Sequence, residues 1–353
     1  MQRRASVVGL GLIGGSIARA LRRAGWTVTG VDLDPDIERA AVDAHVIDGS
    51  GLDVDAELVV VATPVAAVPE QVERVLAQTG AVVTDVGSVK SPIAAAVTHP
   101  RFVPGHPMAG SEQDGLHGAD EDLFSGAVWV LTPTESTSDN ALGAVSKFVA
   151  DLDAEPVVLD AEVHDAIVAV VSHVPHLTAA TLMDLATDRS IEHSVLLRLA
   201  AGGFRDMTRV AAGRSSIWPD ICADNRQAIV GVLDELLVRL GEMRRMVDEQ
   251  DRDALVDRLE SARQARVNLP AGAREVADLV ELRIPIPDRP GELAHITKLA
   301  TDLSVNIHDI ELAHSTEGDL GVLILVVTAG PGERLVAALT EQGYHPSLRS
   351  LLR

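Results

Sequence analysis

Residues 4–34, RASVVGLGLIGGSIARALRRAGWTVTGVDLD, decide the fold class of this chain. A short apolar run at 5–8 is followed by a glycine-rich turn, and a helix-forming segment at 13–23 leads to a second apolar run at 27–31. Asp32 follows that run directly. This order of strand, glycine turn, helix, strand and carboxylate is typical of a dinucleotide-binding β-α-β unit. The stretch therefore predicts an α/β, Rossmann-type N-terminal domain.

The glycine turn has the spacing G-x-G-x-x-G, which allows a pyrophosphate to approach the backbone closely. The helix after it directs its first N–H groups and the positive end of its dipole to the same place. The residues predicted to contact the cofactor are Gly9, Gly11, Leu12, Ile13, Gly14, Asp32, Thr63 and Pro64. The carboxylate of Asp32 can accept hydrogen bonds from the adenosine ribose and repel a 2′-phosphate, so NAD is expected rather than NADP. The alternative is a glycine loop that serves packing alone.

Composition limits the classes of partner. The chain has 353 residues, 46% of them hydrophobic, so two or three globular domains are expected. Its formal net charge of -22 disfavours nucleic acid and anionic membranes as partners. Cys222 is the single cysteine, which excludes an intrachain disulfide and fits a reducing compartment. The longest apolar stretch, 58–68, is too short to span a bilayer, so we expect a soluble cytoplasmic protein.

The pattern of the sequence changes three times along the chain. Strand-like and helical runs alternate over 1–159, which predicts a mostly parallel, doubly wound sheet. Long helical segments over 160–267 predict an all-α middle domain. Residues 268–275 are expected to form a linker. Residues 276–353 show the order β-α-β-β-α-β, which predicts a ferredoxin-like α+β domain.

Loops at the carboxyl ends of the strands are candidate ligand sites, because doubly wound sheets bind ligands there. Strands of the N-terminal domain are predicted at 58–62, 81–86, 101–104 and 127–131. The loops that follow the first three of these contain Thr63, Ser88 and His106, respectively. Each loop also has Gly or Pro, so a simple tight turn is the alternative. The polar residue at each strand end favours a ligand site.

Three histidines fall on the first helical segment of the middle domain. His173 and His176 lie three residues apart, and His164 precedes them. The spacing alone would suit a metal pair, but the sequence contains no H-E-x-x-H motif and no cysteine cluster to complete such a site. No metal site is therefore predicted, and structural hydrogen bonding is the alternative for these histidines.

Two arginines form a second polar pattern in this domain. Arg205 and Arg209 are four residues apart, so on a helix they share one face. Two guanidinium groups on one face suit the carboxylates of an acidic ligand. Surface pairing with Asp206 or Asp220 is the alternative, and the residues by themselves favour it.

Five motifs together resemble the prephenate/arogenate dehydrogenase family of tyrosine biosynthesis. They are the glycine turn, DVGSVK at 85–90, GHPMAG at 105–110, VSHVPH at 171–176 and GGFRDMTR at 202–209. The resemblance covers residues 1 to about 270 and implies NAD-linked oxidative decarboxylation of prephenate to 4-hydroxyphenylpyruvate, or of arogenate to tyrosine. It also implies a homodimer built through the helical domain. The stretches DRPGEL at 288–293 and NIHDI at 306–310 resemble ACT regulatory modules.

The resemblance assigns roles to particular residues. His106 matches the catalytic histidine, which accepts the proton of the substrate hydroxyl as hydride leaves for the nicotinamide, and Ser88 matches its hydroxyl partner. The carboxylate-binding positions of the family match Arg209, Arg205 and His176. In the ACT-like domain, an amino-acid effector such as tyrosine is expected at Gly291, Asn306 and His308. The alternative is a dimerisation module that binds no ligand.

Two other classes of protein are weighed against this one. The β-hydroxyacid dehydrogenases combine a similar outline with a lysine in the helical domain, and here no lysine lies between Lys147 and Lys298. A non-catalytic sensor of NAD and an amino acid would leave His106 without a purpose. Prephenate and arogenate differ in a keto or amino group on the side chain, and the sequence leaves that choice open.

Overall fold

The structure of the chain is a computed structural model. It describes residues 3–111, 113–192, 196–268, 279–287, 289, 291–314 and 320–350. The chain divides into two compact units, Met1–Glu242 and Met243–Arg353. The predicted linker at 268–275 lies, apart from Asn268, outside the described residues.

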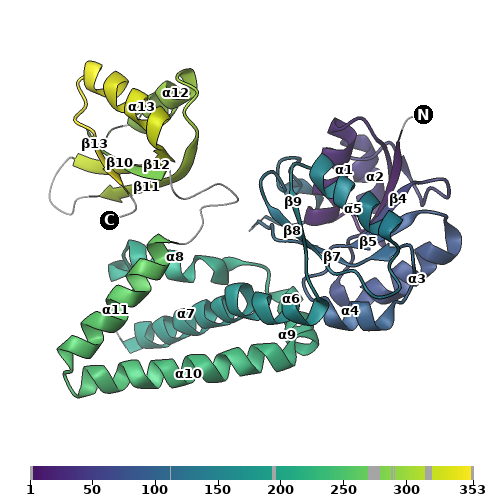
Figure 1. Ribbon diagram of the computed structural model, residues 1–353, viewed down its shortest axis with the longest axis horizontal. Helices are drawn as coiled ribbons and strands as arrows, with labels where there is room; N and C mark the ends of the chain where they lie inside the picture. The colour runs from purple at the N-terminus through teal and green to yellow at the C-terminus, as the bar shows by residue number, and fades with distance from the viewer. Residues whose placement is uncertain are drawn as a thin grey trace. The chain divides into compact units, whose positions relative to one another are not determined.

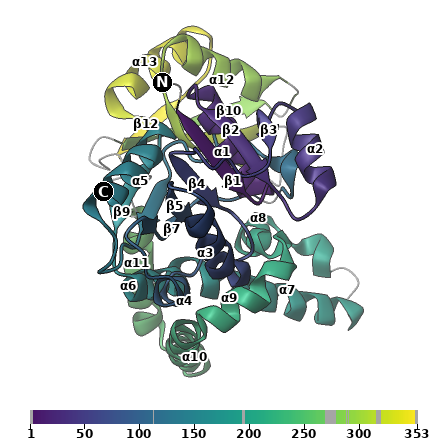
Figure 2. The ribbon, with the colours of Figure 1, turned by 90° about the vertical axis from the view of Figure 1, so that its right-hand side faces the viewer.

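The first unit begins with a six-stranded sheet in which every paired strand is parallel (Figure 1). Its strands are β1 (Arg4–Val8), β2 (Thr27–Val31), β3 (Gly49–Ser50), β4 (Leu58–Val61), β5 (Val82–Asp85) and β6 (Phe102–Val103). They follow the order β3-β2-β1-β4-β5-β6, most of which is visible in Figure 2. The connecting helices are α1 (Leu12–Arg23), α2 (Pro35–Asp43), α3 (Val68–Gln78), α4 (Ser91–Ala96) and α5 (Asp139–Asp151). The predicted Rossmann-type sheet is confirmed.

Neighbouring residues of β1 belong to different hydrophobic cores, because successive side chains of a strand point to opposite faces. Val7 packs in a cluster with Ile17 and Leu21 of α1. Val8 packs in a second cluster with Val72 of α3. The sheet is therefore buried on both faces, as expected for parallel strands whose crossovers are helices.

A second, three-stranded sheet holds residues that the sequence placed elsewhere. It consists of β7 (Gly105–Pro107), β8 (Val128–Leu131) and β9 (Glu155–Val158), with β7 antiparallel and β9 parallel to β8. The expectation of a loop is therefore wrong for 105–107, although 108–110 lie outside strands and helices, and the expectation that 127–131 joins the main sheet is wrong. The strand β7 was missed because three residues are too few to show alternation, and Pro107 is tolerated there because β7 is an edge strand.

The helical part of the first unit begins at residue 161, where α6 (Ala161–Val168) continues through a π-helical turn (Ala169–His173) into α7 (Val174–Glu192). Further on are α8 (Gly202–Thr208), α9 (Trp218–Asp224) and α10 (Arg226–Asp248), followed in the second unit by α11 (Arg252–Val267). Helices α7 and α10 run alongside each other and share a buried cluster that contains Val174 and Ile229 (Figure 1). The all-helical character predicted for the middle region is confirmed.

One described run, Ala161–Ser190, is long and apolar enough to cross a membrane by length and composition, because it contains an 18-residue window with a mean hydropathy of 1.5. The sequence reading considered 58–68 as the longest apolar stretch and overlooked this run. Only 28% of its most apolar window is buried inside the chain, so much of the run presents apolar side chains outward.

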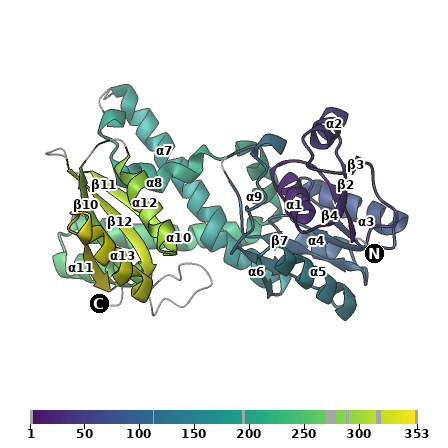
Figure 3. The ribbon, with the colours of Figure 1, turned by 90° about the horizontal axis from the view of Figure 1, so that it is seen from above.

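The second unit ends in an antiparallel sheet of order β11-β12-β10-β13. Its elements are β10 (Leu279–Pro287), α12 (Glu292–Asp302), β11 (Ile307–His314), β12 (Leu320–Thr328), α13 (Ala329–Glu341) and β13 (Ser347–Ser350). Both helices lie on one face of the sheet (Figures 1 and 3). This is the β-α-β-β-α-β order that the sequence predicts, although the ends of the predicted outer strands, 276–278 and 351–352, lie outside the described residues.

Candidate active site

The glycine turn is packed tightly at its two ends and open in the middle. Gly9 has a φ of 94°, and a Cβ added there would lie 2.5 Å from the carbonyl oxygen of Ala62. A Cβ on Gly14 would collide with the carbonyl oxygen of Gly9. At Gly11, apart from the glycine itself and its two neighbours in sequence, no atom of the described chain is found within 4 Å of the place a Cβ would take. The open side faces the start of α1, where helix N–H groups favour a pyrophosphate.

Asp32 connects the end of β2 to this turn. Its Oδ2 accepts a hydrogen bond of 2.7 Å from the backbone N–H of Leu10, and its Oδ1 accepts one of 3.0 Å from Asp34. A carboxylate has about four acceptor positions, so Asp32 can still accept from a ribose hydroxyl. At the end of β4, the buried hydroxyl of Thr63 has no hydrogen-bond partner among the described residues. The open turn, the carboxylate and the hydroxyl fit a bound dinucleotide.

A fully buried ion pair lies at the end of β5. Lys90 and Asp85 are both 0% exposed, and the Lys90 ammonium donates to the Asp85 carboxylate and, at 2.9 Å, to the carbonyl oxygen of Gly105. The Asp85 carboxylate also accepts from the N–H of Gly105 at 3.1 Å and of Gly87 at 2.8 Å. Both backbone polar groups of Gly105 are thus fixed by the pair, which sets the start of β7 and with it the position of the next residue, His106.

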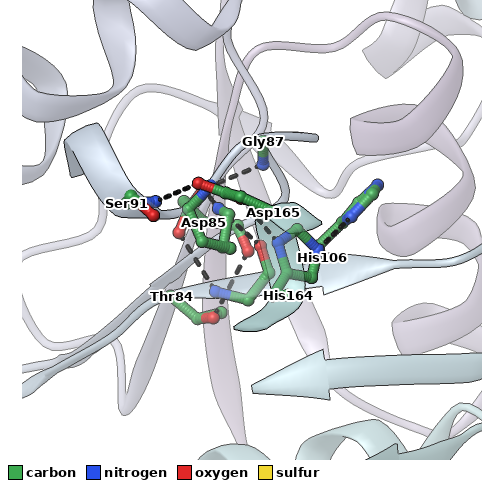
Figure 4. A network of polar contacts seen from close by, with 9 residues as sticks. Thr84, Asp85, Gly87, Ser91, His106, His164 and Asp165 are labelled. Atoms are coloured by element: carbon green, nitrogen blue, oxygen red, sulfur yellow. Dashed lines mark hydrogen bonds and ion pairs between the residues drawn. The ribbon is translucent and has the colours of Figure 1, made fainter. Parts of the chain in front are cut away.

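His106 begins a chain of hydrogen bonds that runs into the helical segment (Figure 4). The Nδ1 of His106 lies 2.9 Å from Nε2 of His164 on α6. The Nδ1 of His164 lies 2.8 Å from Oδ1 of Asp165. His164 and Asp165 are buried, whereas His106 is partly exposed. The side chain with access to a ligand is therefore supported from behind by two buried polar residues.

The carboxylate of Asp165 is also bonded to the start of α4. Its two oxygens accept hydrogen bonds of 2.8 Å from the backbone N–H groups of Lys90 and Ser91, so Asp165 caps this short helix from another part of the chain. Burial by itself raises the pKa of Asp165, but the hydrogen bonds from His164, Ser91 and Lys90 outweigh burial and lower it. The carboxylate is therefore charged at neutral pH.

The imidazole of His106 is uncharged at neutral pH. Burial is the main cause that places its pKa well below the ordinary 6.5. The charge of Lys90 lowers the pKa further, as a proton on His164 or His173 would, and the negative charge of Asp165 opposes the shift. An uncharged imidazole can accept a proton, as a general base must.

Two further histidines lie near the hydrogen bonds that connect His106, His164 and Asp165. His173 is buried, which lowers its pKa to about 4, and its Nδ1 lies 3.1 Å from the side-chain amide of Asn225. Asn225 also donates to the backbone carbonyl of Asp165 at 2.8 Å. His176 stacks on Trp218 with ring centroids 3.8 Å apart. His173 is thus a packed structural residue, whereas His176 has its ring orientation fixed by an indole.

The predicted arginines and serine are placed as follows. Arg205 is exposed on α8 and donates to the carbonyl oxygen of Ala200 at 3.2 Å. Arg209 is exposed at the first residue of the 3-10 turn Arg209–Ala212, so the two arginines do not share one continuous α-helix as the sequence reading expected. Ser88 lies partly buried between β5 and α4. In the described part of the chain, the hydrogen-bond partner of His106 is His164 and not Ser88.

Comparison with known families gives the site a context. The family model described as prephenate dehydrogenase, nucleotide-binding domain, matches residues 17–158. The model described as prephenate dehydrogenase, dimerization domain, matches residues 160–261. The chain belongs to the prephenate dehydrogenase family. The family predicted from the five motifs is therefore confirmed, whereas the ACT-like domain lies beyond both matches.

Relatives of the prephenate dehydrogenase family resemble the chain over most of its length. Prephenate dehydrogenase of Bacillus subtilis (strain 168) is 32% identical over 335 residues, which cover 90% of each chain. The crystal structure of prephenate dehydrogenase from Aquifex aeolicus in complex with hydroxyphenyl propionate and NAD+ has a TM-score of 0.72 and 29% identity, covering 76% of this chain and 99% of that one. Synechocystis arogenate dehydrogenase follows with a TM-score of 0.65 and 30% identity, covering 74% and 98%. The predictions of an NAD-dependent dehydrogenase and of NAD as cofactor are confirmed.

Sequence reasoning in terms of this family missed three residues of the site. Asp85 and Lys90 stand at the two ends of the motif at 85–90, and their opposite charges beside apolar neighbours were a signal for a buried pair. The sequence motifs assign no role to Asp165, although it directly follows His164. A histidine followed directly by a carboxylate on a predicted helix indicates an imidazole that the negative charge can orient and stabilise.

Proposed function

We propose that this family member oxidises prephenate with NAD+ and releases carbon dioxide to give 4-hydroxyphenylpyruvate, with His106 as the general base. The observation that carries the proposal is the uncharged imidazole of His106, partly exposed on β7 and supported from behind. It is able to take the proton of the substrate hydroxyl as the same ring carbon loses hydride. Arogenate, named in the Synechocystis relative, is the alternative substrate.

The proton of the reaction balances through His106, and the electron pair passes to the nicotinamide cofactor. Bound NAD+ supplies the acceptor for the hydride. The C–H bond of the hydroxyl-bearing carbon breaks with its electron pair, the O–H proton passes to His106, and a carbonyl forms. The bond to the ring carboxylate then breaks, carbon dioxide leaves, and the electron pair makes the ring aromatic with a phenolate oxygen. His106 returns its proton to that oxygen, so the protein gains no proton.

Local cations must offset the charge of the chain if a dianionic substrate is to bind. The net charge is -22, so the long-range field repels carboxylates. We assign the substrate carboxylates to Arg209 and Arg205, both exposed, and to His176, whose ring is held by Trp218. Because His106 Nδ1 is already paired with His164, a contact from Ser88 belongs at His106 Nε2 or at the substrate hydroxyl.

The test is NADH formation measured with prephenate and with arogenate. His106→Asn is expected to lower kcat by about 10²–10⁴-fold with little change in the KM for NAD, and the exposed His117→Asn is the matched control. In the wild type, kcat/KM should fall in acid only below pH 6.5, because the pKa of His106 is lowered. An unchanged kcat for His106→Asn contradicts the assignment of His106 as the general base. If NADH forms only with arogenate, arogenate and not prephenate is the substrate.

We also propose that the helical part forms a homodimer. The matched family model is a dimerization domain, and apolar side chains of α6 and the turn after it are exposed at helical spacing. They are Val163, Ile167, Val170 and Val171. A neighbouring groove of about 540 Å³ is lined mostly by apolar residues of α7 and α10, among them Val174, Leu182 and Leu236. A second copy accounts for this apolar surface, and for the apolar run Ala161–Ser190, without a membrane.

Sedimentation of the purified protein tests the dimer. Val171→Asp places a charge on a side chain that is 60% exposed in one copy and is expected to shift the protein toward monomer. Val54→Asp, at a valine 61% exposed in the Rossmann domain, is the matched control and should leave the dimer intact. A wild-type protein that sediments as a monomer would remove the proposal.

Finally, we propose that the C-terminal domain is ACT-like and binds an amino-acid effector such as tyrosine. Its β-α-β-β-α-β order supports this, and the match to the Bacillus subtilis protein covers 90% of the chain, so it must extend beyond residue 261. Gly291, at a φ of 98°, is the N-cap residue of α12, and Asn306 lies just before β11. The side chain of His308 is outside the described part, although its backbone lies at a register shift of β11.

Initial rates with tyrosine, phenylalanine and tryptophan test this regulation. If tyrosine inhibits the wild type, Gly291→Ala should weaken inhibition, because a Cβ is strained at this φ. Gly330→Ala, in open space on α13, is the matched control. Regulation by this domain is excluded if no amino acid changes the rate or if Gly291→Ala is inhibited as strongly as the wild type.

A further inference from the structure

The buried pair His164–Asp165 has no part in the proposed chemistry so far, yet it is bonded to the base. We propose that His164 and Asp165 are positioning residues that fix the proton of His106 on Nδ1 and so leave Nε2 as the atom that accepts the substrate proton. This inference rests on the proposed reaction and names the residues that make His106 a base.

The direction of each hydrogen bond follows from the chemistry of its acceptor. Oδ1 of the charged Asp165 can only accept, so the proton of a neutral His164 is on Nδ1, 2.8 Å away. The Nε2 of His164 then carries a lone pair and accepts from Nδ1 of His106 at 2.9 Å. A neutral His106 with its proton on Nδ1 has its remaining lone pair on Nε2. The opposite tautomer of His106 would present an N–H to the substrate hydroxyl and could not accept its proton.

The same chain stabilises His106 after it has taken the proton. The imidazolium retains an acceptor for its Nδ1–H, and the charge of Asp165 lies one ring away with no solvent between them, since His164 is 1% exposed. Holding the proton until it returns to the phenolate oxygen avoids its loss to solvent. A charged carboxylate that orients a histidine through the ring N–H acts in the same way in other enzymes that use a histidine base.

A purely structural role must be separated from this one, because Asp165 also caps α4. With its amide nitrogen in the place of Oδ1, Asp165→Asn keeps an oxygen for the cap to Ser91, gives up the cap to Lys90 and offers an N–H group toward Nδ1 of His164. His164 would then move its proton to Nε2 and donate to His106, which leaves the His106 proton on the substrate-facing Nε2. Asp224→Asn is the matched control, since it removes another negative charge close to Asp165 without touching the chain of hydrogen bonds.

The tautomers can be read from ¹⁵N chemical shifts of labelled imidazoles in the full-length protein, with His106→Asn and His164→Gln spectra for assignment. We expect His106 to carry its proton on Nδ1 in the wild type and in Asp224→Asn, and on Nε2 in Asp165→Asn. In parallel, kcat of Asp165→Asn should fall by about 10²–10⁴-fold with the KM for NAD unchanged. A proton on Nε2 of His106 in the wild type overturns the proposal, as does a kcat for Asp165→Asn within about threefold of wild type.

Substitutions of His164 give a second test if Asp165→Asn does not fold. His164→Leu removes the acceptor, and His164→Gln supplies an amide oxygen that can accept from His106. We expect Gln to restore about tenfold or more of the kcat that Leu loses. Equal activities for Leu and Gln overturn the acceptor role. The spectra report the tautomer of His106 without any turnover. A lack of activity toward prephenate would therefore contradict the proposed function and leave the tautomer proposal to be tested by the spectra.

Discussion

Replacing Lys90 by methionine tests the buried ion pair at the end of β5. The change removes an ammonium that is 0% exposed. The equally buried carboxylate of Asp85 keeps two donors among the described residues, the backbone N–H groups of Gly87 and Gly105. Breaking a buried pair on one side destabilises a protein by about 3–5 kcal/mol, and the two remaining donors favour the lower end, about 3 kcal/mol. The double variant Lys90→Met/Asp85→Asn has no unpaired charge, so it should be more stable than Lys90→Met by at least about 1 kcal/mol.

Urea unfolding at pH 7 measures the effect through tryptophan fluorescence, because Trp26, Trp129 and Trp218 all lie in the first unit. Arg214→Met, which breaks an exposed pair with Asp114, is the control and should have little effect on stability. Loss of the Lys90 charge should also raise the pKa of His106, so the acid limb of kcat/KM moves to higher pH. A stability loss for Lys90→Met below about 1 kcal/mol would refute the reasoning, since it would mean that the pair is not charged in the folded protein.

Three other predictions follow from the site and its surroundings. Asp32→Ala should reduce the preference for NAD over NADP, measured as the ratio of kcat/KM, by about tenfold or more. Asp34→Ala, at the N-cap of α2, is the control and should leave this preference unchanged. A wild type that uses both cofactors equally contradicts this role of Asp32. Arg209→Ala should raise the KM for prephenate by about 10- to 150-fold, because a charge-assisted hydrogen bond contributes about 1.5–3 kcal/mol, and an equal rise in the KM for NAD would indicate a structural role. The folded-state pKa of His173 is about 4 and lies below its unfolded value, so this residue should lower the free energy of unfolding by about 2 kcal/mol as the pH falls from 7 to 5. In His173→Asn, the free energy of unfolding should decrease less between pH 7 and pH 5 than in the wild type. The control His117→Asn, at an exposed histidine, should show the same decrease as the wild type. A decrease in His173→Asn equal to that of the wild type would contradict the lowered pKa of His173.

The N-terminal unit could be predicted from sequence because its signals are local. A glycine spacing, one amphipathic helix and alternating apolar runs lie within 31 residues, and the strand expected at 27–31 is the observed β2. The strand β7 could not be predicted, because three residues carry no period and its pairing with β8 is set by tertiary contacts. His106 and His164 are 58 residues apart, so their contact has no local signature. Lys90 is fully buried because Asp85 and the backbone of Gly105 satisfy it, whereas composition alone places lysine at the surface.

The cap that Asp165 provides for α4 makes competence for catalysis depend on domain docking. A nucleotide-binding domain produced alone would keep Gly9, Gly11 and Asp32 and could hold NAD, but its His106 would lack the acceptor on α6. The two halves could then be expressed as separate polypeptides, neither able to catalyse the reaction, with activity returning upon their association. The rate of such a split enzyme would be proportional to the concentration of the associated complex. Its dependence on fragment concentration would give the dissociation constant of the two domains.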